Sequence, residues 1–484
     1  MVKRNIPENP QATQYDLKFA RGFLYSLNPV FVPPNFVGAK SRLPIFLHPL
    51  TTFAEASKGN QIVAVVGTML DPDRPELGPS GVAEMLLENI GDLQRHIDRC
   101  IGRFAVFWQD AGSRGFQIDA MGLRSAFCRI DENQVTVASH ARLTMLASGE
   151  SKQRPIRYRW GYPGISTPFA NVIRMNPNAR LEFETGRFVR FFPVKPLPKQ
   201  SIEVAWDLAF RRAEKAAEAL ARRDGKIVLS LTAGLDSRTT LSVTQELWSN
   251  IDFFTYNHAE QHKIDLRIAS KIADCYDLHF LHLGTQTEDD IPERMKKLFR
   301  NNTFLSHNRA VAYAYSEVFP ASTFHIRSNL LELFRSNLFQ KGHTDSRFRD
   351  GLQGSKELTD YYCSKLTGRK ETNAKYQNYF EEMCEVFDWK GGIAFASSWD
   401  LFFVEHRMAA WQGGVALECD VAFETVFLFN SREIIRAFMG VPQEVRAKSG
   451  YLKKVLKRRL PEISDIPINP RQFSYPVPER GNWR

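Results

Sequence analysis

The sequence contains little cysteine and no long apolar run. Its six cysteines, among 484 residues, are scattered and form no Cys-x-x-Cys pair, so we predict neither a disulfide framework nor a zinc site and expect buried thiols. Residues 1–16 hold no apolar core of signal-peptide length, and no run approaches the roughly 20 apolar residues that span a bilayer. These absences favour a soluble, cytoplasmic protein without a membrane partner.

The chain also lacks a concentrated charge. Its formal net charge is +10, but the basic residues are dispersed and no basic run is interleaved with stacking aromatics. This pattern counts against nucleic acid and favours a small anionic ligand. A chain of 484 residues with 43% hydrophobic content is too long for one ordinary core, which predicts two domains, or one with a large helical addition. The oligomeric state stays open, a homodimer being one alternative.

One stretch, from Lys226 to Leu241, organises the rest and reads KIVLSLTAGLDSRTTL. The apolar run Ile227–Leu229, with Leu231, predicts a buried strand, and the small residues after it open a helix from Arg238. Such a strand, loop and helix bring backbone N–H groups and two hydroxyls to one point, which suits a phosphate. Neither GxxxxGK[ST] nor GxGxxG is present. The alternative is a small-residue turn at a strand end.

The loop resembles the SGGLDS pyrophosphate-binding loop of the asparagine synthetase family. Thr232 and Ala233 replace its first Ser and first Gly, while the run from Gly234 to Ser237 matches it. The resemblance implies an ATP pyrophosphatase domain that adenylates a carboxylate. The ATP-binding residues that it implies are Ser230, Leu231, Thr232, Ala233, Gly234, Asp236, Ser237, Thr255 and Tyr256.

The region from about Leu43 to Phe192 alternates short apolar runs with turn residues, which predicts a mostly β domain with few helices. Expected strands are Gln61–Val66, Phe104–Trp108, Gly115–Ile118, Val135–Ala138 and Leu181–Phe183, and expected helices are Val82–Asn89 and Leu93–Cys100. The segments Gly102–Trp108, Asp119–Arg124 and Val137–Ser139 resemble the second half of a class II glutamine amidotransferase domain. That domain precedes the ATP domain in asparagine synthetase, and it implies an αββα (Ntn-hydrolase-like) sandwich over residues 1–192.

The resemblance fails at the glutaminase nucleophile, which in that domain is an N-terminal cysteine. Here Met1 is followed by Val2, and the first cysteine is Cys100. We therefore interpret the domain as a degenerate scaffold, as in β-lactam synthetase and lasso-peptide cyclases, and do not expect glutamine as nitrogen donor. For Asp119 and Arg124 we favour a structural salt bridge in a turn over a functional pair.

Residues 193–200 include three prolines and predict an extended linker between the first domain and an ATP domain over 201–484. An amphipathic helix over Val204–Arg223 leads into the nucleotide-binding strand. The alternation of Phe253–Tyr256, Asp265–Tyr276 and His279–Leu283 predicts a parallel sheet with helices on its faces. The fold class is therefore α/β, the second domain being an adenine-nucleotide α-hydrolase-like parallel sheet with helical additions.

Two stretches bear on a metal. In the run His258–His262 the glutamate is one position late for the HExxH pattern, so zinc hydrolysis is disfavoured. The stretch Phe324–Asn337 stands where the family has SGEGADELFGG, and Leu331 falls on the second magnesium aspartate. The resemblance then implies Mg²⁺ held by Asp236 and Glu332. The catalytic residues that we expect are Asp236, Glu332, Arg335 and Lys453.

The arginines of the same stretch admit two interpretations. Arg327 and Arg335 add positive charge where pyrophosphate would leave, so an altered site could use guanidinium groups for part of the metal's work. Alternatively, the site has decayed.

The stretch Asp400–Arg432 resembles the acceptor-substrate region of the family. We expect Glu405, Arg407 and Trp411 to bind substrate, and the alternative is a set of structural ion pairs. Arg407 and Trp411 share a helical face by their i,i+4 spacing. The helix expected over Gly450–Leu460 carries Lys453 and resembles the family's K-Y-L-L-R segment, and the tail Pro467–Arg484 is expected to be irregular and to cover the cleft.

The resemblance as a whole implies an AMP-forming, ATP-dependent C–N ligase of biosynthesis. It would join a small-molecule or peptide carboxylate to an amine, with ATP and Mg²⁺ as cofactors. Two alternatives stay open, a tRNA-modifying enzyme of the wider pyrophosphatase-loop group and a non-catalytic nucleotide-binding homologue.

Overall fold

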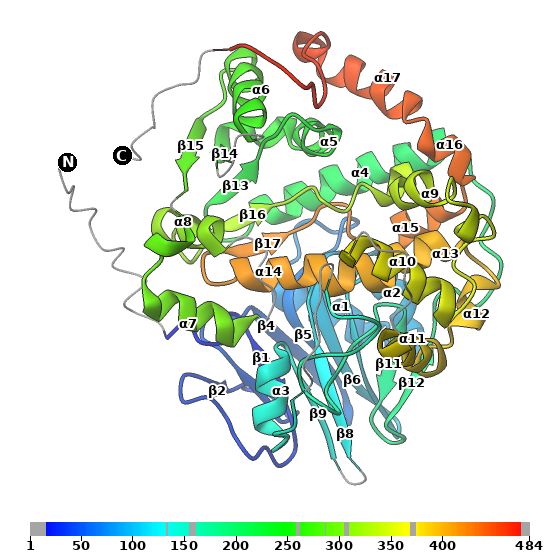
Figure 1. Ribbon diagram of the computed structural model, residues 1–484. Coiled ribbons are helices and arrows are strands. Elements are labelled where there is room, and N and C mark those ends of the chain that lie inside the picture. Colours follow the sequence, from blue (N-terminus) through cyan, green and yellow to red (C-terminus); the bar gives the residue numbers. More distant parts are fainter. Residues whose placement is uncertain are drawn as a thin grey trace.

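The computed structural model describes residues 16–131, 134–153, 161–257, 262–285, 287–303, 309–367 and 374–475. Two antiparallel sheets of six strands come first along the chain, and a parallel sheet of five strands follows. Figure 1 shows the antiparallel sheets, in blue to cyan, below the helices and the parallel sheet of the later chain. The predicted α/β class, with an antiparallel first part and a parallel second part, is confirmed.

The two antiparallel sheets pack face to face. One has the order β10-β8-β9-β1-β3-β2 and the other β12-β11-β7-β6-β5-β4. The strands of the first are β1 (Phe23–Tyr25), β2 (Val37–Gly38), β3 (Ile45–Leu47), β8 (Phe127–Asp131), β9 (Gln134–Ala138) and β10 (Ile173–Arg174). Those of the second are β4 (Phe53–Lys58), β5 (Gln61–Leu70), β6 (Ile101–Asp110), β7 (Ser113–Ile118), β11 (Ala179–Glu182) and β12 (Arg187–Arg190). Tyr25 of one sheet stacks on Phe107 of the other with ring centroids 5.3 Å apart, so their inner faces form one core.

Helices cover both outer faces of this sandwich. Helices α1 (Pro79–Glu88) and α2 (Leu93–Arg99) bury apolar side chains against the β5–β6 face. On the other side α3 (Ala141–Ala147) packs against β1 and β9. The layer order is therefore αββα, as the resemblance implied, and the two helices expected in this region are confirmed to within a few residues.

The parallel sheet has the order β15-β14-β13-β16-β17, so its first strand lies at the centre. Its strands are β13 (Ile227–Ser230), β14 (Ile251–Asn257), β15 (Phe280–Gly284), β16 (Phe324–Ile326) and β17 (Glu424–Val426). Strands β14 and β15 follow β13 on one side of it, and β16 and β17 then add on the other side of β13. Such a reversal is a topological switch point, and ligands of open α/β sheets bind beyond the carboxyl ends of the two strands that flank it.

Helices make up most of the later chain. Their bounds are α4 (Ile202–Ala221), α5 (Leu235–Val243), α6 (His262–Cys275), α7 (Glu293–Asn302), α8 (Arg309–Val318), α9 (Asn337–Gly342), α10 (Ser355–Thr367), α11 (Ala374–Val386), α12 (Trp389–Ile393), α13 (Ser398–Phe402), the π-helix η6 (Phe403–Gln412), α14 (Gly413–Cys419), α15 (Arg432–Met439), α16 (Gln443–Ala447) and α17 (Gly450–Arg459). The expected helices before β13, between β14 and β15, and at residues 450–460 are confirmed. No membrane-length apolar helix occurs in the part of the chain that the structure describes.

The expectation of buried thiols holds for four of the six cysteines, and the other two, Cys275 and Cys384, are half-buried. The core is continuous across residues 193–200, because one cluster contains Leu70 and Ile101 of the antiparallel part together with Trp206, Leu229 and Phe334 of the later chain.

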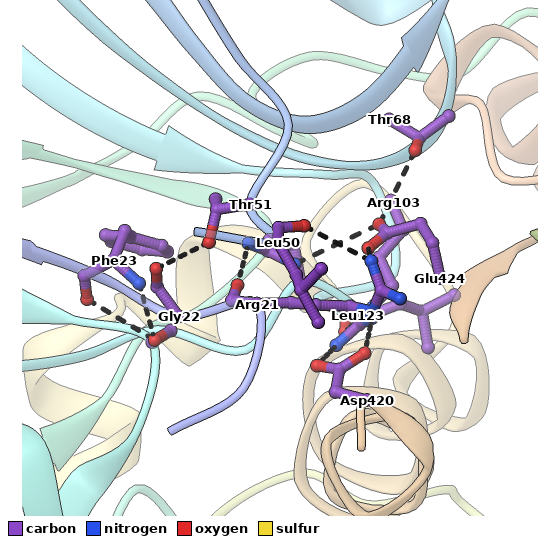
Figure 2. A network of polar contacts seen from close by, with 12 residues as sticks. Arg21, Gly22, Phe23, Leu50, Thr51, Thr68, Arg103, Leu123, Asp420 and Glu424 are labelled. Atoms are coloured by element: carbon purple, nitrogen blue, oxygen red, sulfur yellow. Dashed lines mark hydrogen bonds and ion pairs between the residues drawn. The ribbon is translucent and has the colours of Figure 1, made fainter. Parts of the chain in front are cut away.

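A buried polar network also joins the two parts (Figure 2). Both terminal nitrogens of Arg103, on β6, donate to the carboxylate of Asp420, which follows α14, at 2.5 and 2.7 Å. These two side chains are 0% and 1% exposed. Arg21 and Arg124 lie 3.9 and 4.0 Å from the carboxylate of Glu424, at the start of β17. Buried carboxylates of the second part are thus paired with arginines of the first.

Asp119 and Arg124 do not form the predicted salt bridge in their turn. Asp119 accepts hydrogen bonds from the backbone N–H groups of Leu123 at 3.0 Å and Arg124 at 2.6 Å, and from the Nδ2 atom of Asn430 at 2.7 Å. The guanidinium of Arg124 points instead into the network around Glu424. Asp119 therefore stabilises the turn, as predicted, but through hydrogen bonds from backbone amides and not through a salt bridge with Arg124.

Candidate functional site

The loop between β13 and α5 is closed by its own hydroxyl groups. The Oγ atoms of Thr232 and Ser237 lie 3.0 Å apart, and the Ser237 hydroxyl also accepts from the backbone N–H of Thr232 at 3.2 Å. Gly234 caps α5 in an extended conformation, so the helix begins at Leu235, three residues earlier than expected. Two hydroxyls and a helix N-terminus therefore meet at the carboxyl end of the central strand, where a phosphate could accept hydrogen bonds.

Neighbouring strands hold this loop in place. Leu231 donates its N–H to Phe254 at 2.8 Å and accepts from the hydroxyl of Thr255. The Oγ atom of Ser230 lies 3.1 Å from Nε2 of His325, on β16. These predicted ATP-binding residues thus use their polar atoms partly to join the three central strands.

Two further groups, one of them the predicted Tyr256, lie at the same end of the sheet. Asp265, near the start of α6, accepts the N–H of Ala233 at 2.9 Å, so that amide is already occupied by a carboxylate. Tyr256 lies half-buried near the end of β14, and burial raises the pKa of its phenol.

Asp236, in the first turn of α5, is paired with Arg335. The Nη2 atom of Arg335 lies 2.5 Å from Oδ1 of Asp236, although the residues are 99 positions apart. They meet because Asp236 follows β13 and Arg335 follows β16, the strands that flank the switch point. Burial raises the pKa of Asp236 to about 6 against the opposing charge of Arg335, and the nearby charge of Glu332 acts in the same direction as burial.

Glu332 and Arg335 do not lie on an α-helix. Residues Leu333–Arg335 form one 3₁₀ turn that ends at Ser336, whose φ of 48° is left-handed. Leu331, at the position of the second magnesium aspartate in the resemblance, is fully buried in the main core. That position is apolar packing, which explains why no carboxylate stands there.

The carboxylates present do not fit a magnesium ion held by Asp236 and Glu332. One oxygen of Asp236 already binds a guanidinium, and a cation at that carboxylate would lie against the positive charge of Arg335. Over the described ranges, no group of three or more His, Cys, Asp or Glu side chains could hold a metal ion. Of the run His258–His262, only His262 belongs to those ranges, at the start of α6.

Glu405, which was expected to bind substrate, lies instead in a buried network of polar contacts. Its carboxylate, 1% exposed, is bound by Arg190 at 2.7 Å, Asn176 at 2.7 Å and Asn178 at 2.7 Å. These three partners belong to the antiparallel part. Glu405 is therefore a structural ion-pair member that joins the two parts, the alternative left open above.

Arg407 and Trp411 are placed differently from Glu405. The guanidinium of Arg407 lies over the Trp411 ring, 3.6 Å from its centroid, which is a close cation–π contact. Burial lowers the pKa of Arg407 to about 10, and the nearby charge of Glu332 opposes this shift. Arg407 therefore lies close to the segment that carries Glu332 and Arg335.

His406, between these residues, is a buried neutral imidazole. Its Nε2 lies 3.1 Å from the Tyr162 carbonyl, and its ring stacks on Phe402 with centroids 4.9 Å apart. Burial, with the positive charge of Arg174, lowers the pKa of His406 to about 3. Folding therefore holds this ring unprotonated at pH values where the unfolded chain would protonate it.

We expect this histidine to make the protein sensitive to acid. Below the ordinary pKa of 6.5 the unfolded ring takes up a proton and the folded ring does not, so the free energy of unfolding falls by up to about 1.4 kcal/mol per pH unit. His406→Gln should flatten the slope between pH 7 and 5 in urea unfolding curves. His343→Gln, at an exposed ring, is the control, and equal slopes for all three proteins would contradict the assignment.

Lys453, the remaining predicted catalytic residue, is exposed on α17. No hydrogen bond or ion pair joins its side chain to the described residues around Asp236, so the structure does not bring it to the site.

The segment Ile466–Phe473, which we call the strap, includes the start of the tail that was expected to cover the cleft. Arg238 of α5 donates to the carbonyls of Ile466 at 2.8 Å and Pro467 at 2.7 Å. The N–H of Asn469 donates to the Ala233 carbonyl at 3.2 Å. The strap thus covers part of the loop, as expected for the tail, whereas residues 476–484 lie outside the described ranges.

Comparisons with known proteins give little. No family model and no curated protein matches the chain. One similar solved structure is the allosteric regulatory enzyme of purine biosynthesis, with 12% identity, a TM-score of 0.23, and coverage of 50% of this chain and 62% of that one. Another is glutamine phosphoribosylpyrophosphate amidotransferase from B. subtilis, complexed with ADP and GMP, with 11% identity, a TM-score of 0.23, and coverage of 68% and 75%. Likenesses this weak support no statement about activity.

Proposed function

We propose that the protein binds ATP at the loop between β13 and α5 and uses it to activate a carboxylate for amide formation. The observation that carries this proposal is the placing of Thr232, Ser237 and the N-terminus of α5 at the carboxyl end of the central strand, beside the switch point. That is where the phosphates of a nucleotide are held in parallel α/β sheets.

In the proposed reaction a substrate carboxylate oxygen attacks the α-phosphorus of ATP. The bond from that phosphorus to the bridging oxygen breaks and pyrophosphate leaves, which gives an acyl-adenylate. An amine then attacks the acyl carbon, AMP leaves, and the amine loses a proton. The loop hydroxyls and α5 amides would stabilise charge on the phosphates, and Arg407 over Trp411 would contact the acid or the amine.

Gly234→Ala tests this role of the loop. A methyl group at Gly234 would meet Thr232 Oγ1 at 3.4 Å and Asn469 Oδ1 at 3.7 Å, which are ordinary contacts, and the glycine φ of −80° suits alanine. The fold should therefore tolerate the change, but a phosphate could not approach the backbone as closely. We expect ATP–pyrophosphate exchange, measured with a panel of small and peptide carboxylates, to fall by about 100-fold.

Gly91→Ala is the matched control, because nothing lies within 4 Å of the added methyl group. Two results would refute the proposed chemistry. One is exchange in Gly234→Ala at the rate of the unchanged protein, and the other is a lack of exchange in the unchanged protein with every carboxylate of the panel. ATP binding without exchange would instead favour a non-catalytic nucleotide-binding protein, an alternative that the pairing of Asp236 with Arg335 supports.

A further inference from the structure

The guanidinium of Arg335, beside the loop, has N–H donors that are not used in hydrogen bonds to the described residues. Arginine carries five N–H donors, and toward the residues that the structure describes this side chain forms a single hydrogen bond, from Nη2 to Asp236. Its Nε is buried and has no hydrogen-bond partner within the described ranges. Leaving a buried donor unpaired is unfavourable, so the group is suited to a second anion next to Asp236.

The charged side chains around this pair cancel one another. The negative charge of Asp236 is paired with the positive charge of Arg335. Glu332 lies close enough to both Asp236 and Arg407 to affect the ionisation of each. Two carboxylates are thus matched by two guanidinium groups, so the pair and its neighbours offer no net negative charge to a divalent cation. The other carboxylate at the loop, that of Asp265, is held by the Ala233 N–H.

We propose that Arg335 binds the polyphosphate of the nucleotide in place of a divalent cation, so that this site takes up ATP without Mg²⁺. The inference rests on the proposed function, since it assumes a nucleotide at the loop between β13 and α5. A guanidinium is permanently charged and binds phosphate oxygens through two parallel N–H groups. Asp236 then orients the Arg335 side chain and does not act as a metal ligand.

The position of Arg335 in the sheet supports this role. Because Asp236 follows β13 and Arg335 follows β16, the pair spans the two strands that flank the switch point. Phosphates bound at the Thr232–Ser237 hydroxyls would lie at the same edge of the sheet. The side chain of Arg335 is 18% exposed, so it can be reached from solvent.

The first test measures ATP binding to the full chain by isothermal titration calorimetry, in excess EDTA and in MgCl₂. We expect the two dissociation constants to differ by less than about threefold. Binding only in the presence of Mg²⁺ would overturn the inference and leave the proposed function standing. Absence of binding in both buffers would overturn the nucleotide site itself, and with it this inference.

A second test uses Arg335→Met, which keeps an unbranched side chain as far as the position of Nε and removes the charged group. In EDTA we expect ATP affinity to fall by about 10- to 100-fold. Added Mg²⁺ should restore part of the loss, because Asp236 and Glu332 would then have one guanidinium fewer and could attract a cation. Unchanged affinity in EDTA would overturn the inference.

Two further variants separate direct phosphate binding from simple neutralisation of Asp236. The double variant Asp236→Asn, Arg335→Met should stay as weak as Arg335→Met, whereas recovery to the original affinity would mean that Arg335 only neutralises the carboxylate. Arg335→Lys carries the test if the methionine variant does not fold, and should bind with intermediate affinity. Arg347→Met, which removes another Arg–Asp pair, with Asp345 at 2.6 Å, is the matched control and should change nothing.

Discussion

Asp420→Ala is expected to lower the free energy of unfolding by about 3–5 kcal/mol. The two oxygens of Asp420 bind both terminal nitrogens of Arg103 at 2.5 and 2.7 Å, and both side chains are fully buried. Removing the carboxylate leaves the Arg103 guanidinium in the core without its bidentate partner. Glu424, another carboxylate near it, already lies beside two other arginines. Guanidinium chloride unfolding, followed by tryptophan fluorescence, measures the loss.

The matched control is Asp345→Ala, which breaks a half-exposed pair with Arg347 and should cost no more than about 1 kcal/mol. If the penalty at Asp420 comes from the uncompensated charge, the double variant Arg103→Met, Asp420→Leu should recover much of the stability. Equal losses for Asp420→Ala and Asp345→Ala would show that the buried pair contributes little.

Glu405→Ala is also expected to lower the free energy of unfolding by about 3–5 kcal/mol. Its carboxylate holds Arg190 and the amides of Asn176 and Asn178, all of them buried. Thermal unfolding should reveal the loss, and Glu405→Gln, which keeps one acceptor oxygen, should lose less. Glu385→Ala, at an exposed position of α11, is the control.

The same variant separates the structural role of Glu405 from the role in substrate binding that its sequence position suggested. At a temperature where Glu405→Ala remains folded, its KM for the carboxylate substrate, measured by ATP–pyrophosphate exchange, should equal that of the unchanged protein. A selective rise in that KM, with stability intact, would restore Glu405 to the substrate site.

Local features of the site could be predicted from the sequence because each depends on neighbouring residues. Ile227–Leu229 is apolar throughout, as a strand buried on both faces requires, and the small residues from Thr232 to Gly234 can only form a loop there. The structure has this strand and loop, and differs only in starting α5 at Leu235. The αββα layers could be predicted only through the resemblance of three segments to a known domain.

Features that depend on topology could not be predicted in this way. Strands β16 and β17 have three residues each, too few for a period to show. Without β16 the residue patterns do not show the switch point. The resemblance placed Asp236 and Arg335 in one site, but their direct ion pair across 99 positions was not predicted. The helices between β15 and residue 450, apart from the helical region around Arg407, were not placed individually. Several of them, such as α12, α13 and α16, have only five residues, too few for an amphipathic pattern to show.

Glu405 differs from its expected placement for another reason. It was grouped with Arg407 because both lie close together in the sequence, but residues two apart on a helix do not share a face. In η6 the two side chains diverge, Glu405 toward Arg190 and Arg407 toward Trp411. Spacing alone therefore contained the information needed to separate them.

The strap has a consequence for how loop motion could be followed. Its Asn469 is bonded to the Ala233 carbonyl, its Ile466 and Pro467 carbonyls are held by Arg238, and its Phe473 carbonyl accepts from Arg267 of α6 at 3.1 Å. A displacement of the loop at Ala233 would therefore stretch or release the bond to Asn469, while the other bonds tie the strap to α5 and α6. The segment works as a mechanical coupling, and a fluorophore attached beside Phe473 would convert a small movement at Ala233 into an optical signal.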